Sequence, residues 1–414
     1  MKKTFIILFN TFLIILFLEL IFKTQDLLSK NYFDNKKNII SSYSNYKNHP
    51  VIGYTARKNS AGKEIHYVPN TYFKTTTNSD GFRTSEFYPK HKKNFRIIIL
   101  GDSFIYGMNA NDNETIGRKL EQLYKRNISE NIEVISMGVI GYSGLNYAGI
   151  ARTYFEYLKP DLVILCIDQS DFNDDEEKVK IYEYEKDESG FPYFIDFKVD
   201  QKNLRVKSNR ELEFYVDNKK NFIDKLKLES SLFNRLNKVR HRLKKINLDK
   251  RFNELLKKNQ QILIYKDLSN AEKKNLYKII NSGDILKYDL EESKKNYTVT
   301  YNSIEYIKKK TDQINSKLVL SSYPYPWFIN PNYGKFFQLK NFNKILDLRG
   351  NEVYPNLLDY YALKLEIENL NSYPYFKKTK NKLWGDYDPH FNAEGYEEYA
   401  NFLYNETIKL IEIN

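Results

Sequence analysis

The chain has little cysteine and little histidine. Its 414 residues include one cysteine, Cys166, which excludes an intramolecular disulfide, a cysteine zinc cluster and an iron–sulfur site. Its five histidines leave few candidates for chemistry that depends on imidazole. Cys166 sits in the middle of an apolar run, so we expect a core residue rather than a reactive thiol. We expect no cofactor and no bound metal ion.

Acidic residues are outnumbered by basic ones, 53 against 65, which gives a formal charge of +12. The excess is mostly lysine in a chain also heavy in Asn, Tyr, Phe and Ile, a bias typical of an A/T-rich genome. An anionic polymer or membrane surface is the alternative explanation. The sequence contains no recognised nucleic-acid-binding motif, so we expect no nucleic-acid partner. Hydrophobic residues make up 41% of the chain, enough for a packed core.

Long hydrophobic runs are scarce as well, with one exception at the N-terminus. A nearly unbroken apolar stretch from Phe5 to Phe22 follows Lys2 and Lys3. Eighteen helical residues reach about 27 Å, enough to cross the core of a bilayer. No small-residue cleavage site follows, so residues 1–23 are predicted to be an uncleaved signal-anchor, a cleaved signal peptide being the alternative. The flanking lysines predict a single-pass plasma-membrane protein with residues 24–414 outside the cytoplasm.

Buried strands and amphipathic helices alternate in the middle of the chain. Continuous apolar runs at 96–100, 132–135 and 161–167 each end in a turn signal, and helical periodicity separates them. A fourth strand is predicted at 317–321, and a last helix starts after Asn392, a candidate N-cap. The β-α-β-α-β order predicts a three-layer α/β/α domain with a parallel sheet.

The predicted domain is discontinuous in sequence. It comprises residues 96–175 and 316–414, preceded by a linker and N-terminal extension at 24–95. Residues 176–315 are rich in Lys, Glu and Asn and are predicted to form a large, partly helical insertion. Within it, helices are expected near 222–243 and 271–280.

The candidate catalytic residues follow the predicted strands directly. In an open α/β sheet the site lies beyond the carboxyl ends of the strands. Ser103 is a candidate nucleophile, His390 the base that takes its proton, and Asp388 the carboxylate that orients the imidazole. The backbone N–H groups of Ser103 and Gly141 are candidate donors to a developing oxyanion.

The order of these motifs resembles the SGNH/GDSL hydrolase superfamily. The matching stretches are Ile-Leu-Gly-Asp-Ser-Phe at 99–104, Gly-Val-Ile-Gly-Tyr-Ser at 138–143, Pro-Asp-Leu-Val-Ile-Leu at 160–165 with Asp171, and Asp-Pro-His-Phe-Asn-Ala-Glu-Gly-Tyr at 388–396. The resemblance implies a flavodoxin-like sheet and the roles given above to Ser103, Gly141, Asp388 and His390. Within the superfamily the chain looks most like membrane-anchored bacterial proteins associated with O-acylation of cell-surface polysaccharides. The Asn-x-x-Gly-Phe-Arg stretch at 78–83 fits that branch.

The chain departs from the superfamily pattern in its third and last blocks. The third usually reads Gly-x-Asn-Asp, its Asn donating to the oxyanion, whereas residues 168–171 read Asp-Gln-Ser-Asp. Ser170 therefore replaces the Asn as oxyanion donor, and Gln169 is an alternative donor. Losing one such donor costs about 10²–10³ in rate. The last block has Asp-x-His rather than Asp-x-x-His, with Asp386 as a second candidate to orient the imidazole.

Three further residues are candidates for substrate binding, namely Gln169, Asp171 and Tyr325. The predicted function is that of a serine-dependent acyl-ester hydrolase or O-acetyltransferase acting on an extracytoplasmic polysaccharide. A membrane-bound acyl-transfer protein is a possible partner. Two alternatives stay open: a lipase or lysophospholipase of the same fold, and a non-catalytic glycan-binding protein on a degenerate hydrolase fold.

Overall fold

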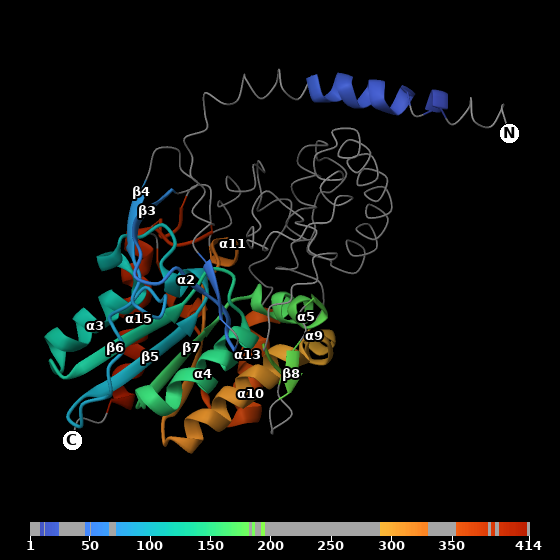
Figure 1. Cartoon of the computed structure of the whole chain (residues 1–414). Helices are drawn as coiled ribbons and strands as arrows, with labels where there is room; N and C mark the ends of the chain where they lie inside the picture. Colours follow the sequence, from blue (N-terminus) through green and yellow to red (C-terminus); the bar gives the residue numbers. More distant parts are fainter. Residues whose placement is uncertain are drawn as a thin grey trace. The chain divides into compact units, whose positions relative to one another are not determined.

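The computed structural model describes residues 9–11, 13–24, 46–49, 51–65, 72–181, 184–186, 192–194, 290–329, 353–379, 382–385 and 389–411 (Figure 1). The chain divides into two units, Met1–Ser41 with Tyr215–Gln260, and Ser42–Phe214 with Gln261–Asn414. The helices predicted near 222–243 and 271–280 lie outside the described residues.

The first unit contains the predicted signal-anchor. Residues 9–11 and 13–24 are helical, and most of their large apolar side chains are exposed. Across the described parts of the chain, no helix combines the length and the apolar character needed to span a bilayer. The signal-anchor therefore stays a prediction.

The second unit is built on a parallel sheet of five strands. These are β5 (Phe95–Gly101), β6 (Ile132–Gly138), β7 (Leu162–Ile167), β10 (Lys317–Ser322) and β11 (Glu368–Leu370), in the spatial order β11-β10-β7-β5-β6. Every neighbouring pair is parallel. Numbered by their place in the chain, the strands lie in the order 5-4-3-1-2, which is the flavodoxin-like topology. The predicted fold class is confirmed at this level.

Helices cover both faces of the sheet (Figure 1). On one face α4 (Gly144–Leu158) packs against α10 (Thr298–Gln313), and on the other α3 (Ile116–Asn127) packs against α15 (Ala393–Thr407). The chain moves in one direction along the sheet from β5 to β6 and in the opposite direction from β6 to β11. Because the crossovers are right-handed, α3 therefore lies on one face and α4 and α10 on the other. The remaining elements along this unit are α2 (Ser103–Tyr106), η3 (Asp112–Glu114), α5 (Asp171–Ile181), β8 (Tyr184–Lys186), β9 (Pro192–Phe194), α9 (Leu290–Asn296), α11 (Pro326–Ile329), α13 (Val353–Leu365), α14 (Tyr373–Phe376) and η5 (Ile408–Leu410).

Four of the five strands lie where the apolar runs predict them, with boundaries shifted by a few residues, whereas β11 was not predicted. The N-cap prediction at Asn392 is confirmed, because its Oδ1 accepts a hydrogen bond of 2.8 Å from the backbone N–H of Gly395. The residues just before α3 form a capped turn of their own. There Glu114 Oε2 accepts from the backbone N–H of Asn111 at 2.7 Å, which closes a separate 3₁₀ turn before α3 begins at Ile116.

The predicted linker at 24–95 is structured over much of its length. Two antiparallel hairpins form there, β1 (Tyr46–His49) with β2 (Gly53–Ala56), and β3 (Ala61–Ile65) with β4 (Tyr72–Thr76). Ile52, Tyr54 and Phe82 are buried, so this segment is part of the packed unit. Its side chains are irregularly spaced, which is why strand periodicity did not reveal it.

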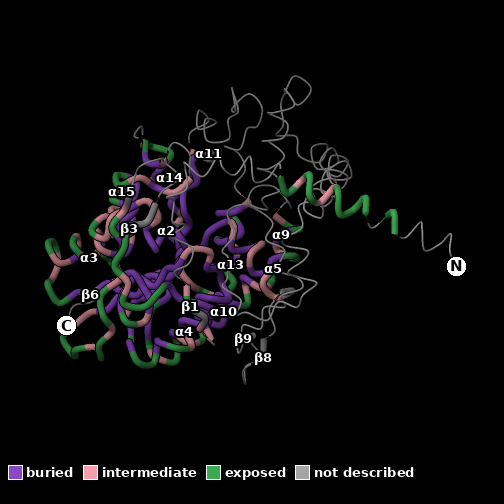
Figure 2. Tube along the Cα trace, turned by 45° about the horizontal axis from the view of Figure 1, so that its top comes forward, coloured by how far each residue is buried: buried purple, intermediate pink, exposed green. Residues whose placement is uncertain are grey.

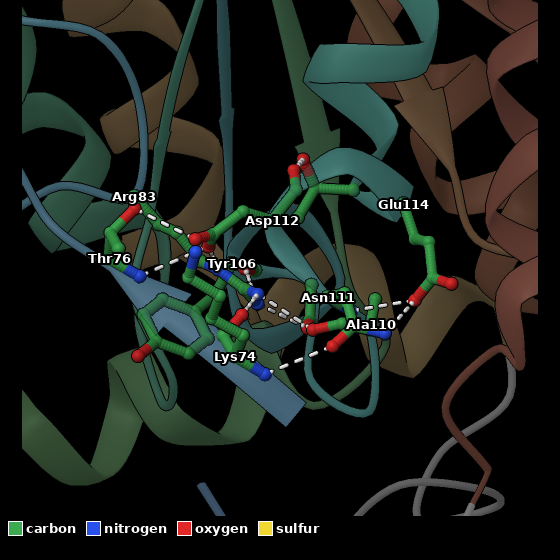
Figure 3. A network of polar contacts seen from close by, with 10 residues as sticks. Lys74, Thr76, Arg83, Tyr106, Ala110, Asn111, Asp112 and Glu114 are labelled. Atoms are coloured by element: carbon green, nitrogen blue, oxygen red, sulfur yellow. Dashed lines mark hydrogen bonds and ion pairs between the residues drawn. The ribbon is translucent and has the colours of Figure 1, made fainter. Parts of the chain in front are cut away.

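Arg83 ties this N-terminal segment to the start of the α/β domain (Figure 3). Its Nε donates to Asp112 Oδ1 at 2.8 Å. The other four guanidinium protons go to backbone carbonyls, those of Lys74, Tyr106, Gly107 and Ala110, at 2.7–3.1 Å. All five donors of a buried guanidinium are thus satisfied, which offsets the cost of burying such a charge.

The core lies between the sheet and its two helix layers (Figure 2). Every residue of β7 is buried, and Cys166 in that strand is 0% exposed. Burial raises the pKa of the Cys166 thiol to about 12. The prediction that Cys166 is an unreactive core residue is confirmed.

Candidate active site

Strand β5 delivers Ser103 to the carboxyl end of the sheet. The strand ends at Gly101, where a Cβ would lie 2.5 Å from the hydroxyl of Tyr323, so only glycine fits this close approach. Asp102 then caps α2, its Oδ1 accepting from the Phe104 N–H at 3.1 Å. Ser103 is consequently the first helical residue, and it is 6% exposed.

His390 reaches Ser103 from the other end of the chain. It precedes α15 in a turn fixed by the isolated bridge between Trp384 and Phe391. Its ring lies 4.8 Å from that of Phe104. Ser103 Oγ is 2.7 Å from His390 Nε2, within reach for proton transfer from a serine nucleophile to a histidine base. The two residues that sequence analysis paired, 287 positions apart, are thus brought together.

The third member of the predicted triad cannot be placed. Asp388 and the alternative Asp386 lie outside the described residues. Their assignment to orient the imidazole stays a prediction.

A second carboxylate touches the nucleophile, which sequence analysis missed. Asp102 Oδ2 lies 3.1 Å from Ser103 Oγ. Burial, and then the nearby carboxylate of Asp168, raise the pKa of Asp102 to about 7. A carboxyl group with such a pKa is present in both protonation states at neutral pH. The signal in the sequence that could have indicated this contact is the position of Asp102 directly before Ser103 in the Gly-Asp-Ser motif.

Residues 168–171 form a braced turn after β7. The Tyr325 hydroxyl donates to the carboxylate of Asp168, 2.8 and 2.6 Å from its two oxygens, and the Ser170 N–H donates to Asp168 Oδ1 at 2.6 Å. Asp171 Oδ2 accepts from the Asp168 N–H at 3.0 Å and from the Tyr147 hydroxyl at 3.1 Å. Burial raises the pKa values of Asp168 and Asp171. Ser170, Tyr325 and Asp171 therefore make contacts within the chain, and their predicted roles toward substrate stay predictions.

Gln169 behaves differently from its neighbours in this turn. It is 4% exposed, yet among the described residues its side-chain amide has no hydrogen-bond partner at either atom. Buried amides without partners are costly. The Ser170 side chain is hydrogen-bonded to the carboxylate of Asp168. Of the two residues expected to replace the missing Asn, Gln169 is thus the one whose donor has no partner among the described residues.

The last residue of β6 lies against the Ser103 turn and leads into the glycine loop. A Cβ on Gly138 would sit 2.9 Å from the carbonyl oxygen of Asp102, so the two backbones are in close contact. Gly141 has a φ of +77°, a conformation that favours glycine. In the part of the chain that the structure describes, the backbone N–H groups of Ser103 and Gly141 donate no hydrogen bond. Both donors predicted for an oxyanion are therefore available.

The chain is similar to several solved structures at low sequence identity. No protein-family model and no curated protein matches the chain. Among solved structures, it is similar to a family 3 carbohydrate esterase from Clostridium thermocellum at 14% identity and TM-score 0.35, over 77% of this chain and 97% of that one. It is also similar to a GDSL-like lipase from Bacteroides thetaiotaomicron at 11% identity and TM-score 0.34, over 78% and 93%.

A catalytic mutant of an acetylxylan esterase from Geobacillus stearothermophilus is similar at 11% identity and TM-score 0.35, over 77% of this chain and 95% of that one. These three neighbours are named as esterases or as a lipase.

Proposed function

We propose that the protein is a serine-dependent enzyme acting on acyl esters. The observation that carries the proposal is the 2.7 Å approach of Ser103 Oγ to His390 Nε2. Among the described residues, the candidate oxyanion donors, the N–H groups of Ser103 and Gly141, make no other hydrogen bond. A serine nucleophile in contact with a histidine base, together with donors for the oxyanion, are the parts that acyl transfer requires.

The reaction proceeds in two balanced steps. Ser103 Oγ bonds to the ester carbonyl carbon while its proton passes to His390 Nε2, and the N–H groups of Ser103 and Gly141 stabilise the oxyanion. The alcohol leaves with the proton from His390, which gives an acyl-serine. Water or a sugar hydroxyl then attacks the acyl-serine, returning a proton through His390 to Ser103. The two fates differ only in the acceptor.

We further propose an extracytoplasmic polysaccharide as the substrate and a membrane location for the enzyme. The exposed apolar side chains of helical residues 9–11 and 13–24 support a membrane contact. If acetyl groups come from the cytoplasm, a membrane-bound partner has to pass them outward. The Asn-x-x-Gly-Phe-Arg stretch at 78–83 and the Asp-x-His spacing at 388–390 support this branch of the proposal.

The first experiment traps the acyl-enzyme. The wild-type protein is incubated briefly with p-nitrophenyl acetate, and the intact mass and the modified peptide are measured. We expect an acetyl adduct on Ser103, absent from Ser103→Ala. Turnover should fall by at least about 10³ in that variant. Ser303→Ala is the matched control, because Ser303 is also buried but lies on α10, bonded to Val299 O.

No adduct and no turnover in the wild type would contradict the proposal and favour a glycan-binding role. The acyl and acceptor preferences are then read from the same assay. Faster release from acetyl than from long-chain esters excludes the lipase alternative. Acetylated oligosaccharide formed at the expense of free acetate indicates transfer rather than hydrolysis.

A further inference from the structure

We propose that Tyr54 and Lys178 are positioning residues that hold the Gly141 N–H at the oxyanion site. The inference rests on the proposed acyl-ester chemistry and assigns it two residues from outside the motifs. Gly141 needs such support, because glycine has the widest choice of backbone conformations and its φ of +77° is one among many open to it.

Tyr54 fixes the peptide group that carries the donor. Its hydroxyl donates to the carbonyl oxygen of Ile140 at 2.8 Å. That carbonyl and the Gly141 N–H belong to the same planar peptide group, so a bond to one end fixes the direction of the other. Donation to the carbonyl also polarises the peptide, which strengthens its N–H as a donor.

Lys178 fixes the next peptide group. Its Nζ donates to the carbonyl oxygen of Gly141 at 2.8 Å, and to Ser143 Oγ and Asn146 Oδ1 at 2.7 Å each. An ammonium group has three donors, so all of them serve this loop. With a clamped peptide plane on each side, both backbone torsions of Gly141 are held.

Both clamps are themselves anchored. Tyr54 is buried on β2, its ring lies 5.2 Å from that of Tyr142, and the Tyr142 hydroxyl donates to the Tyr54 carbonyl. Lys178 lies on α5, one turn from Asp175, whose Oδ1 accepts from Ser143 Oγ at 2.5 Å. Burial lowers the pKa of Lys178, while the carboxylates of Asp174 and Asp175 favour its charged form. The N-terminal segment and α5 thus meet at one loop.

The test compares Tyr54→Phe and Lys178→Met with the wild type on an activated acetyl ester. Tyr54→Phe removes one hydroxyl and leaves the ring. A misdirected donor acts on the transition state, so we expect kcat to fall about 10-fold in each variant while KM changes less than about 2-fold. The rate is normalised to the amount of Ser103 that forms the acetyl adduct, which removes any unfolded fraction.

Affinity for a boronic acid gives the second readout. Ser103 Oγ bonds to boron, its proton passes to His390, and a boron-bound oxygen occupies the oxyanion site. We expect the dissociation constant to rise by about the same factor as kcat falls. Tyr361→Phe is the matched control, since Tyr361 is a buried tyrosine whose hydroxyl donates to a backbone carbonyl, that of Tyr297, at 2.8 Å. It should leave both readouts within about 2-fold.

The outcomes separate the two proposals. A wild type that forms no adduct overturns the proposed function and this inference with it. A wild type that turns over, with Tyr54→Phe and Lys178→Met equal to Tyr361→Phe in kcat and in boronate affinity, overturns the positioning role alone. If Lys178→Met does not fold, Tyr54→Phe alone decides. An unchanged kcat and an unchanged boronate affinity in Tyr54→Phe then overturn the positioning role.

Discussion

At the scale of single residues, buried carboxyl groups crowd the nucleophile. Asp102, Asp168 and Asp171 are all buried at the carboxyl ends of β5 and β7, and burial is the main cause that raises the pKa of each. Ionised carboxylates there would oppose a negative charge developing on the substrate. A raised pKa favours the neutral form of each carboxyl group and so reduces that opposition.

The pKa of Asp102 predicts a pH-dependent stability. Its folded-state value of about 7 lies above the ordinary 3.8, so the folded chain binds this proton more tightly than the unfolded chain. The contribution of Asp102 to stability therefore falls as the pH rises from about 4 to about 7. Asp102→Asn removes the titration and keeps an oxygen to cap Phe104. Melting temperatures measured across pH should show the variant gaining on the wild type between pH 5 and pH 8.

A difference in melting temperature between Asp102→Asn and wild type that stays constant from pH 5 to pH 8 would contradict this assignment.

At the scale of elements, the N-terminal hairpins hold the turn after β5. Arg83 joins the carbonyls of Tyr106 and Gly107, at the end of α2, to the carbonyl of Lys74 on β4. The helix that starts at Ser103 is four residues long and has little stability of its own. Its position depends on contacts of this kind.

Replacing Arg83 should therefore destabilise the whole unit. A lysine at position 83 has three donors for five acceptors and leaves buried oxygens unpaired. We expect Arg83→Lys to lower the free energy of unfolding by about 3 kcal/mol, measured by urea denaturation. Arg118→Lys on α3 is the control, because its 37% exposed side chain makes a surface ion pair with Glu121 worth less than about 1 kcal/mol. An equal loss of unfolding free energy in Arg83→Lys and Arg118→Lys would show that the Arg83 hydrogen bonds do not hold this unit together.

The sequence predicts the residues proposed for catalysis but not those proposed to position the oxyanion donor. Ser103 and His390 are predictable because each stands in a motif next to a strong strand or helix signal. Tyr54 and Lys178 are not, because each recognises a backbone carbonyl, 86 and 37 positions away, and a carbonyl leaves no trace in residue identity. The hairpins at 46–76 were missed for a related reason, since their burial comes from docking rather than from alternation along each strand.

At the scale of the whole molecule, the strand order determines where chemistry can occur. The chain moves outward from β5 to β6, then returns past β5 to β7, so the direction reverses between β5 and β7. Crossovers on either side of that point leave a crevice at the carboxyl ends. Ser103 follows one of these strands and Asp168 the other. The alternation of β and α segments predicts parallel strands and places the site at their carboxyl ends, but it does not determine the order of the strands in the sheet.

The apolar N-terminal helix predicts membrane association of the full chain. Eight large hydrophobic side chains are exposed on residues 9–21: Phe9, Leu13, Ile14, Ile15, Leu16, Phe17, Leu20 and Ile21. We expect the full chain to float with phospholipid vesicles in a density gradient, and a chain that starts at Ser42 to stay at the bottom, because burying these groups in lipid is favourable. Flotation that is equal for the two chains would contradict the prediction.

Because Cys166 is buried, we expect the folded protein to be unreactive toward thiol reagents. Its sulfur is enclosed in β7, and its raised pKa keeps the reactive thiolate scarce. A cysteine introduced at an exposed position such as Leu363 would then carry a fluorophore or spin label without competition from the native thiol. Modification of Cys166 itself would require the central sheet to open. One residue thus offers both a clean background for surface probes and an internal reporter of opening at the centre of the fold.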